Sequence, residues 1–463
     1  MREDGISKKI YSMILPITAE NVLQMTAGFI SMSMIGRIST VAVGALGIST
    51  RITQIIWALF KGIATGGSVF IAQSYGAGDF NKIKKIAHQT LLSSIILTVI
   101  FQQMVFWRGR ELLSIFNPTD DLAAAAFEYI RIVSWGLPFM VVMLIVAGVL
   151  QGMGNAKTPM KIALIMNLIN IGIGRVLIFG MFGISPMGLK GAALAMVVAQ
   201  IVSALIGLYI LFNKYGAIGH IKGNILLNID KKQVADIYKV GLPSSMESLS
   251  WQIAAVILTR IILSYGNTAF AAYQLALQAE SISYMPATGF GIAATTFIGQ
   301  CLGADKMETA KEYMKELIRD SILLTIAMAS MLVFLPDKIL GLMTYDKEVI
   351  KVGVPYLILM GLVQLPQNIS GVLSGALRGA GFTRAPMIVA MAGLWGVRLP
   401  LSWIFTRFFR YGIVSIWVVM CFDLIFRFIL SLILYKTKNI YSAKPIYENK
   451  TISDGAQNDD TCV

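Results

Sequence analysis

Long apolar stretches recur along the whole chain, and they limit the folds that it can adopt. A segment of about 20 apolar residues can cross the hydrocarbon core of a bilayer. About twelve such stretches occur, near residues 10–35, 45–73, 88–107, 127–150, 160–182, 188–212, 241–264, 269–300, 320–336, 350–372, 385–407 and 412–435. They are longer than barrel strands and do not alternate, so each is predicted to be a helix. We therefore expect an all-α polytopic membrane protein.

The composition and charge agree with a membrane protein. Hydrophobic residues make up 56% of the chain and charged residues 14%, whereas a soluble domain has about 25% charged residues. Lys and Arg total 39 against 25 Asp and Glu, a net charge of +14. Most of the basic residues fall in alternate connections between spans, as the positive-inside rule predicts for cytoplasmic loops. We expect a multi-pass protein of the cell (inner) membrane with both termini cytoplasmic, and not a nucleic-acid-binding protein.

Three motifs recur in the two halves of the chain at one common offset. Pro16 pairs with Pro243, so the offset is 227 residues. The motif pairs are Leu15-Pro16-x-x-x-Glu20 with Leu242-Pro243-x-x-x-Glu247, Phe70-Ile71-x-Gln73-x-x-Gly76-Ala77 with Phe297-Ile298-x-Gln300-x-x-Gly303-Ala304, and Leu150-x-Gly152-x-Gly154 with Leu377-x-Gly379-x-Gly381. Each half holds an even number of spans, so both halves enter the membrane in the same direction. We expect two six-helix bundles related by a pseudo-two-fold axis along the membrane normal.

These repeats predict the domain organisation. We expect an N-terminal lobe over 1–212, a cytoplasmic linker over 213–239 and a C-terminal lobe over 240–436. The linker is rich in Lys, Gly and Asn, and the polar segment 437–463 is expected to be a disordered cytoplasmic tail. The first apolar run is much longer than a signal-peptide core, so we expect the first span to be retained.

The motifs, in this order and at this spacing, resemble those of the multidrug and toxic compound extrusion (MATE) family over nearly the whole chain. Further residues that carry the resemblance are Met34-Ile35-Gly36-Arg37, Ala271-Ala272-Tyr273-Gln274, Glu280-Ser281-x-x-Tyr284-Met285-Pro286 and Gly396-Val397-Arg398-Leu399-Pro400. The resemblance implies twelve helices in two lobes around a central cavity, and exchange of Na⁺ or H⁺ for cationic or amphipathic drugs. Many members carry an acidic residue where this chain has Ser31.

Three glutamates are candidates for coupling transport to a cation. Glu20 follows Lys9 by eleven residues, roughly 16 Å along a helix at 1.5 Å per residue. Glu247 is its mate in the repeat, and Glu280 lies at a similar depth in the eighth span. A carboxyl group at that depth favours its neutral form, so it binds a proton unless sodium or a cationic substrate takes its place. The alternative for each is a neutral glutamate hydrogen-bonded to a neighbouring helix.

Other residues inside the spans are weaker candidates. A role in the substrate cavity and hydrogen bonding between helices are equally good interpretations of the polar side chains. A role as hinges and simple kinks that serve packing are equally good interpretations of the prolines. Candidates for the substrate cavity are Gln24, Ser31, Asn167, Asn170, Gln274 and Gln278, and candidate hinges are Pro16, Pro243, Pro286 and Pro366. Asp423 precedes Arg427 by four residues, so an ion pair within one helix would explain both. Arg398 is interpreted as a helix-end anchor.

No pattern of an enzyme or a metalloprotein is present in the sequence. The chain lacks a GxxxxGK[ST] phosphate loop. Its histidines are His88 and His220, and its three cysteines, Cys301, Cys421 and Cys462, have no CxxC spacing. We expect no enzymatic activity, no metal site and no cofactor beyond a coupling ion, Na⁺ or H⁺.

The sequence favours a secondary antiporter for cationic or amphipathic small molecules, working as a monomer in the lipid bilayer. One alternative is a lipid-linked oligosaccharide flippase of the same superfamily, which would present Arg rather than Glu to the cleft. Another is a non-transporting membrane receptor or scaffold, which the lack of a recognisable soluble domain argues against.

Overall fold

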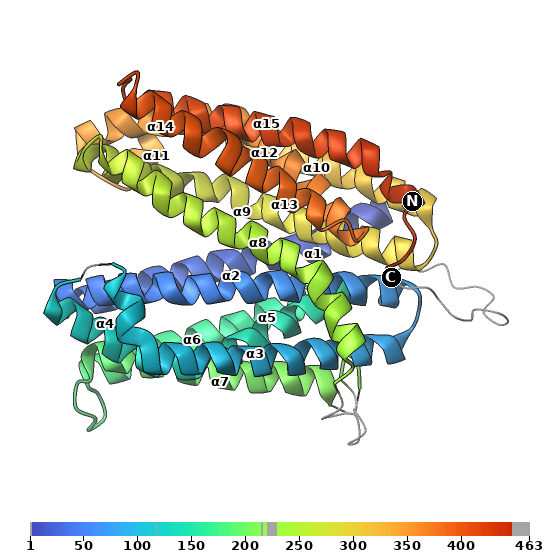
Figure 1. The fold of residues 1–463 in the computed structure, drawn as a ribbon, viewed down its shortest axis with the longest axis horizontal. Helices are drawn as coiled ribbons and strands as arrows, with labels where there is room; N and C mark the ends of the chain where they lie inside the picture. Colours follow the sequence, from blue (N-terminus) through green and yellow to red (C-terminus); the bar gives the residue numbers. More distant parts are fainter. Residues whose placement is uncertain (1, 117, 214–215, 220–228, 447–463) are drawn as a thin grey trace. The chain divides into compact units, whose positions relative to one another are not determined.

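The computed structural model describes residues 2–116, 118–213, 216–219 and 229–446, and these residues form helices joined by short connections (Figure 1). The first half contains α1 (Arg2–Gly36), α2 (Thr40–Gly76), α3 (Phe80–Ser114), α4 (Asp120–Val133), α5 (Leu137–Gly152), α6 (Lys157–Phe179) and α7 (Gly188–Phe212). The second half contains α8 (Lys231–Leu263), α9 (Asn267–Gly303), α10 (Met307–Phe334), α11 (Pro336–Gly341), α12 (Lys347–Gly379), α13 (Arg384–Met391), α14 (Leu399–Arg407) and α15 (Val414–Lys438).

Two of the predicted spans are interrupted helices. A 3-10 turn, η1 (Ser134–Gly136), joins α4 to α5, and a π-helical turn, η3 (Ala392–Arg398), joins α13 to α14. Within the described residues, 11 helical stretches are long and apolar enough to cross a membrane. The predicted span 269–300 corresponds to α9, a helix of 37 residues that is not among those 11. The all-helical, multi-pass fold class is therefore confirmed.

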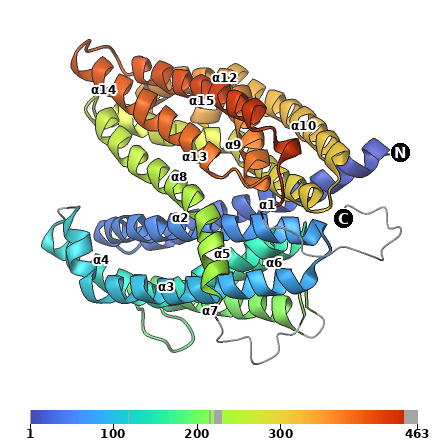
Figure 2. The same cartoon turned by 45° about the vertical axis from the view of Figure 1, so that its right-hand side comes forward.

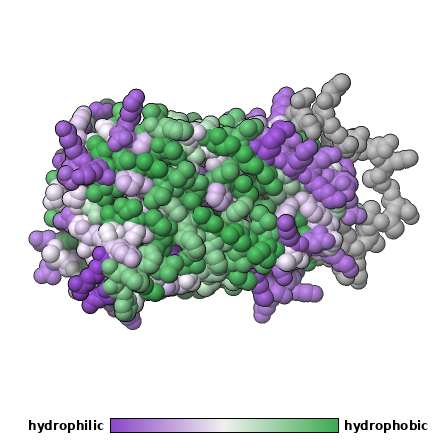
Figure 3. All heavy atoms as spheres, turned by 90° about the horizontal axis from the view of Figure 1, so that it is seen from above, coloured by the Kyte–Doolittle hydropathy of each residue, from purple (hydrophilic) through white to green (hydrophobic). Residues whose placement is uncertain are grey.

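Apolar side chains are concentrated where a membrane protein needs them. Figure 3 shows hydrophobic side chains over the middle of one face, with hydrophilic side chains toward its two ends. Large apolar residues stay exposed on successive turns of single helices; on α15 they are Val418, Phe422, Ile425, Ile429 and Ile433. In water such a stripe would be costly, whereas a lipid environment matches it.

The chain divides into two compact units. One, here called the C-terminal unit, contains Met1–Thr18, Ala72–Gly78 and Met246–Val463. The other, the N-terminal unit, contains Ala19–Ile71 and Asp79–Ser245. The division thus passes through α1, α2 and α8.

Each unit is a bundle of packed helices. In the N-terminal unit α7 packs against α4, α5 and α6, and α3 packs against α4 and α5 (Figure 2). In the C-terminal unit α12 packs against α9, α10 and α15. Buried polar side chains of α12 bond to these neighbours: Asn368 donates to Thr325 of α10 at 2.9 Å, and Ser370 and Ser431 of α15 share a hydrogen bond of 2.7 Å.

The repeated glycines allow α2 and α9 to cross closely within the C-terminal unit. A Cβ atom on Gly76 would meet the backbone carbonyl oxygen of Gln300, and one on Gly303 would meet that of Gln73. The two contacts are equivalent positions of the repeat, and we call this pair of contacts the α2–α9 crossing. The buried Gln73 side chain also donates to the Gly379 carbonyl oxygen at 2.9 Å. Close packing explains why both copies of this motif keep glycine.

Replacing Gly303 with alanine is expected to destabilise the protein by about 1–3 kcal/mol, because the new methyl group overlaps backbone atoms that cannot turn away. The measurement is the midpoint of thermal unfolding in detergent. Gly371→Ala on α12 is the matched control, because a Cβ atom added there would meet no other atom within 4 Å. Equal midpoints for the two variants would contradict the close crossing.

Helices extend into the predicted linker and to the start of the predicted tail. Helix α8 begins at Lys231, ten residues before the predicted span, because Asp230 accepts the backbone N–H of Gln233 at 3.2 Å and caps the helix. The Lys85 ammonium, which donates to Asp230, holds the pKa of that carboxyl below its usual range. At the other end α15 continues to Lys438, and the Ile446 N–H donates to Gln73 at 3.0 Å. Residues 447–463 of the predicted tail lie outside the described residues.

Candidate cation site

The Glu280 carboxyl group lies in the core of the C-terminal unit and has neutral partners. It is 5% exposed. The Tyr356 hydroxyl donates to its Oε2 at 2.6 Å, and the Gln364 amide donates to its Oε1 at 3.1 Å. Both partners come from α12, eight positions apart and so on nearly the same face of that helix. Glu280, one of the predicted candidates, is therefore held by two hydrogen bonds from neutral side chains.

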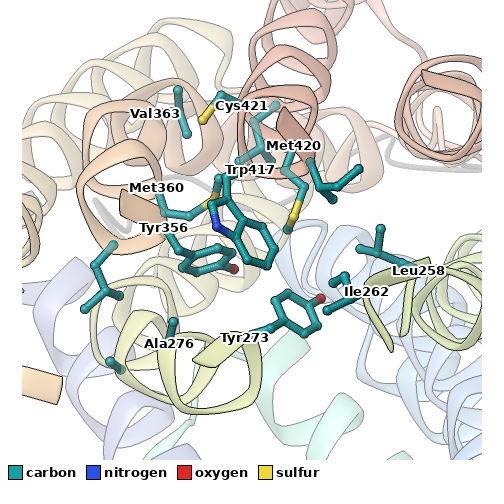
Figure 4. Packing of buried hydrophobic residues seen from close by; sticks show 14 of the residues in the cluster. Leu258, Ile262, Tyr273, Ala276, Tyr356, Met360, Val363, Trp417, Met420 and Cys421 are labelled. Atoms are coloured by element: carbon teal, nitrogen blue, oxygen red, sulfur yellow. The ribbon is translucent and has the colours of Figure 1, made fainter. Parts of the chain in front are cut away.

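Aromatic rings pack together around Tyr356, the hydrogen-bond donor to this carboxyl group. Tyr273 stacks on Trp417 with ring centroids 5.6 Å apart, and Tyr356 meets Trp417 edge-on at 5.0 Å. Figure 4 shows these rings packed among aliphatic side chains from α8, α12 and α15, including Leu258, Met360 and Met420. Tyr356 and Trp417 are fully buried. Such packing lowers the local dielectric, so a charge on Glu280 interacts strongly with its few polar neighbours.

Glu247 has a different environment. Both of its carboxylate oxygens accept hydrogen bonds from Arg378 Nη2, at 2.6 and 2.8 Å. The pair joins α8 to the last turn of α12 and is only partly buried. The structure thus does not bring Glu247 and Glu280 to a shared set of partners, because Glu247 already has a basic counterion in Arg378.

Glu20 belongs to the N-terminal unit. Its Oε1 lies 3.5 Å from the amide nitrogen of Gln24, one turn later on α1. Its Oε2 is buried and has no hydrogen-bond partner among the described residues. Lys61 on α2 contributes a positive charge in the vicinity. Glu20 is therefore an under-satisfied acid, and a proton or a cation would satisfy it.

A second group of buried charges lies in the C-terminal unit. Arg398 Nε donates to Asp423 Oδ2 at 2.7 Å, and Arg427 Nε donates to Asp423 Oδ1 at 2.9 Å. The Trp251 ring faces both guanidinium groups, with centroid distances of 5.4 and 4.5 Å. We call Arg398, Asp423, Arg427 and Trp251 the arginine cluster. The Asp423–Arg427 ion pair expected from their spacing is present, whereas Arg398 is not a helix-end anchor but a second partner of Asp423.

The π-helical turn makes room for this cluster. Arg398 is the last residue of η3, and Gly393 within it lies against Asp423 and Arg427, so a Cβ added to Gly393 would overlap the Asp423 carboxylate and the Arg427 side chain. The extra residue of a π turn re-aims the side chains that follow it. A regular helix with a larger residue at position 393 would leave Asp423 without space for two arginines.

The remaining predicted residues lie in varied surroundings. Asn167 on α6 is buried, and its amide nitrogen has no partner among the described residues. Asn170, Ser31 and Gln278 are half-buried, whereas Gln24 and Gln274 are exposed. Pro16, Pro243, Pro286 and Pro366 all lie inside helices. Their roles as cavity and hinge residues stay predictions.

Sequence reasoning missed Tyr356, Gln364 and Arg378. A signal existed for two of them, because Tyr356 and Gln364 are polar residues inside an apolar span, and such residues usually face a partner. Their pairing with Glu280 could not be inferred, because it depends on how α9 and α12 are rotated against each other.

Known proteins share both the repeat and the fold. The sequence profile of the MatE family matches the chain twice, over residues 16–176 and 243–404. The chain belongs to the MatE family. The two matches begin 227 positions apart, at 16 and 243, so they confirm the duplication inferred from the motifs.

This MatE protein has relatives that align over most of its length. It is 28% identical over 435 residues to a probable multidrug resistance protein, NorM, of Thermotoga maritima, and the alignment covers 93% of this chain and 92% of the relative. It is 26% identical to the probable multidrug resistance protein YoeA of Bacillus subtilis, over 88% of each chain.

Solved structures share its fold. A MOP superfamily transporter from Pyrococcus furiosus superposes with a TM-score of 0.86 at 20% identity, covering 94% of this chain and 96% of that chain. An outward-facing multidrug resistance MATE family transporter superposes with a TM-score of 0.84, also at 20% identity and with the same coverage. At this identity the likeness concerns the fold alone, and it places this MatE protein among multi-pass membrane proteins of that architecture.

Proposed function

We propose that this MatE protein is a secondary antiporter that exports cationic or amphipathic small molecules in exchange for Na⁺ or H⁺. The names of its NorM and YoeA relatives support multidrug export. The observation that carries the proposal is the buried Glu280 carboxyl group, held by Tyr356 and Gln364 without a counterion of its own in hydrogen-bond contact. A single acid in this position can be neutralised by an inward-moving cation or by a cationic substrate, and the competition couples their movements.

The other two acids have different parts in this proposal. Glu20, with its unsatisfied oxygen, is a second cation-coupling residue. Glu247 takes part only when its pair with Arg378 opens, because both of its oxygens are occupied in the present conformation. Alternating access then proceeds by movement of the two lobes, with helix bends at the internal prolines.

The location follows from the distribution of charge. We propose the cell (inner) membrane, with both termini in the cytoplasm, because Lys and Arg are concentrated in the connections on that side. We further propose that the working unit is a monomer, since each chain contains both repeats.

Reconstituted protein tests this function. Liposomes that contain the protein and a fluorescent organic cation are diluted to impose a sodium gradient or a proton gradient, each alone. We expect faster movement of the cation under at least one gradient than without a gradient, and no such difference in protein-free liposomes. Equal rates with and without both gradients, for a panel of cationic and amphipathic compounds, would contradict antiport.

A further inference from the structure

The chain folds back after α15 and runs across helix ends of the C-terminal unit. It reverses direction at Asn439, which has left-handed φ and ψ angles of 40° and 70°, and the Asn439 amide donates to Ser442 Oγ at 2.8 Å. Asparagine adopts this conformation more readily than most residues. A 3-10 turn, η4 (Ile440–Ser442), follows, and Ile440 is buried. We call residues 439–446 the C-terminal strap.

The start of the C-terminal strap is held by α10 and α15. The hydroxyl groups of Tyr441 and Tyr435 share a hydrogen bond of 2.6 Å, and Tyr435 belongs to α15. The Lys311 ammonium group of α10 lies 5.8 Å from the centroid of the Tyr441 ring. Tyr441 and Ile446 are half-buried, and Ser442 is exposed. A segment with so few buried contacts can detach locally without unfolding the helices beneath it.

The end of the C-terminal strap lies at the α2–α9 crossing. The Ile446 N–H donates to Gln73 Oε1 at 3.0 Å, and Gln73 Nε2 donates to the Gly379 carbonyl oxygen at 2.9 Å. Gln73 is 2% exposed, and it is also the residue whose carbonyl oxygen meets Gly303. The Ile446 side chain covers Gly381, since a Cβ added there would lie 2.8 Å from Ile446 Cγ1. One buried side chain thus joins the strap, the end of α12 and the crossing.

The position of Gln73 in the chain distinguishes this contact from ordinary packing of a chain end. Gln73 precedes Ile446 by 373 positions and belongs to α2. The segment Ala72–Gly78 of α2 is part of the C-terminal unit, whereas α2 up to Ile71 is part of the N-terminal unit. A movement that carries the end of α2 away from α9 therefore breaks the hydrogen bonds of Gln73 to the strap and to α12.

The buried amide of Gln73 makes binding of the strap and closure of the crossing depend on each other. If the strap detached while the crossing stayed closed, Gln73 Oε1 would lose the Ile446 N–H and remain shielded from water, and an unsatisfied buried acceptor is costly. If the crossing opened, water could solvate the amide and the strap would lose its partner. A ligand that binds only one of two states shifts the equilibrium toward that state. The strap acts as such a ligand within the chain and favours the closed crossing.

We propose that the C-terminal strap is a regulatory element that holds the α2–α9 crossing closed and is released when this end of the molecule opens. In the proposed antiport this end faces the cytoplasm, because the connection that follows α2 contains Lys82, Lys84 and Lys85. The inference rests on the proposed function for its role in transport, but the effect of the strap on the crossing can be measured without transport.

Hydrogen–deuterium exchange of the full-length protein in detergent micelles, followed by mass spectrometry, measures opening of the crossing. Ile446→Pro removes the backbone N–H that donates to Gln73. We expect amide exchange in peptides that contain residues 72–78 and 297–303 to become roughly fivefold faster, the effect of losing one hydrogen bond. Exchange in α7, which belongs to the N-terminal unit, should stay the same.

Ile446→Val is the matched control, because it keeps the N–H and most of the side chain. Exchange at the crossing as in the wild type in Ile446→Val, together with faster exchange in Ile446→Pro, supports the proposal. Unchanged exchange at the crossing in Ile446→Pro would overturn it, as would equal acceleration in both variants or an equal acceleration in α7. If no compound moves under either gradient, antiport fails, whereas the exchange result still decides whether the strap holds the crossing closed.

Discussion

Replacement of Glu280 by glutamine is expected to reduce gradient-driven efflux to the level of protein-free liposomes. Glutamine has the same size, and its amide can still accept from Tyr356, so the packing of α9 against α12 should persist. It cannot gain or lose a proton and carries no charge to attract a cation, so the coupling is lost. The measurement is the efflux rate in proteoliposomes with equal protein content.

Glu308→Gln is the matched control for that experiment. Glu308 pairs with Lys311 on the surface of α10 and its side chain is 84% exposed. The same change of charge there should leave efflux unchanged. If Glu280→Gln transports as fast as the wild type, Glu280 is not the coupling site; a lower unfolding midpoint for that variant would point to a structural role instead.

Replacement of Asp423 by leucine is expected to destabilise the protein by about 3–5 kcal/mol. Asp423 is fully buried and neutralises two arginines that are themselves buried. Its removal leaves both guanidinium groups without a counterion in a medium that solvates charge poorly. The measurement is the free energy of unfolding in mixed micelles, or the unfolding midpoint where unfolding is irreversible.

Two further variants make that result interpretable. Glu111→Gln breaks the Arg108–Glu111 pair, whose side chains are 67% and 66% exposed, and should cost at most about 1 kcal/mol. Adding Arg398→Met and Arg427→Met to Asp423→Leu removes the unpaired charges and should restore part of the stability. A triple variant no more stable than Asp423→Leu alone would argue that the cluster acts by shape and not by charge.

The sequence predicts the positions of the helices well but not the partners of the charged residues. The length of each apolar segment predicts a span, and the common offset between the motifs predicts the duplication. Both can be read directly from the sequence. The sequence groups Glu247 with Glu280 by their depth in the membrane, by the repeat that pairs Glu247 with Glu20 and by the motifs shared with the family. Depth describes the position along a helix axis, whereas each further residue turns the side chain by about 100° around it. The partners Arg378, Tyr356 and Gln364 depend on that rotation.

The arginine cluster illustrates the same limit. Asp423 and Arg427 lie four residues apart on one helix, so their pairing follows from their spacing. Arg398 comes from another helical segment, the end of the π-helical turn η3, and it donates to Asp423 across the bundle. Sequence periodicity does not predict this π turn, because the periodicity of apolar residues distinguishes helices from strands and not one helical turn from another.

The α2–α9 crossing bears on how such a chain could arise. Gly76 meets Gln300 and Gly303 meets Gln73, so each copy of the motif provides both halves of the contact. This is the pattern of an isologous interface in a symmetric dimer. A half-length ancestor with one copy of the motif already has everything that this contact requires when two identical chains meet. Fusion of the two genes would then keep both halves of the contact within one chain.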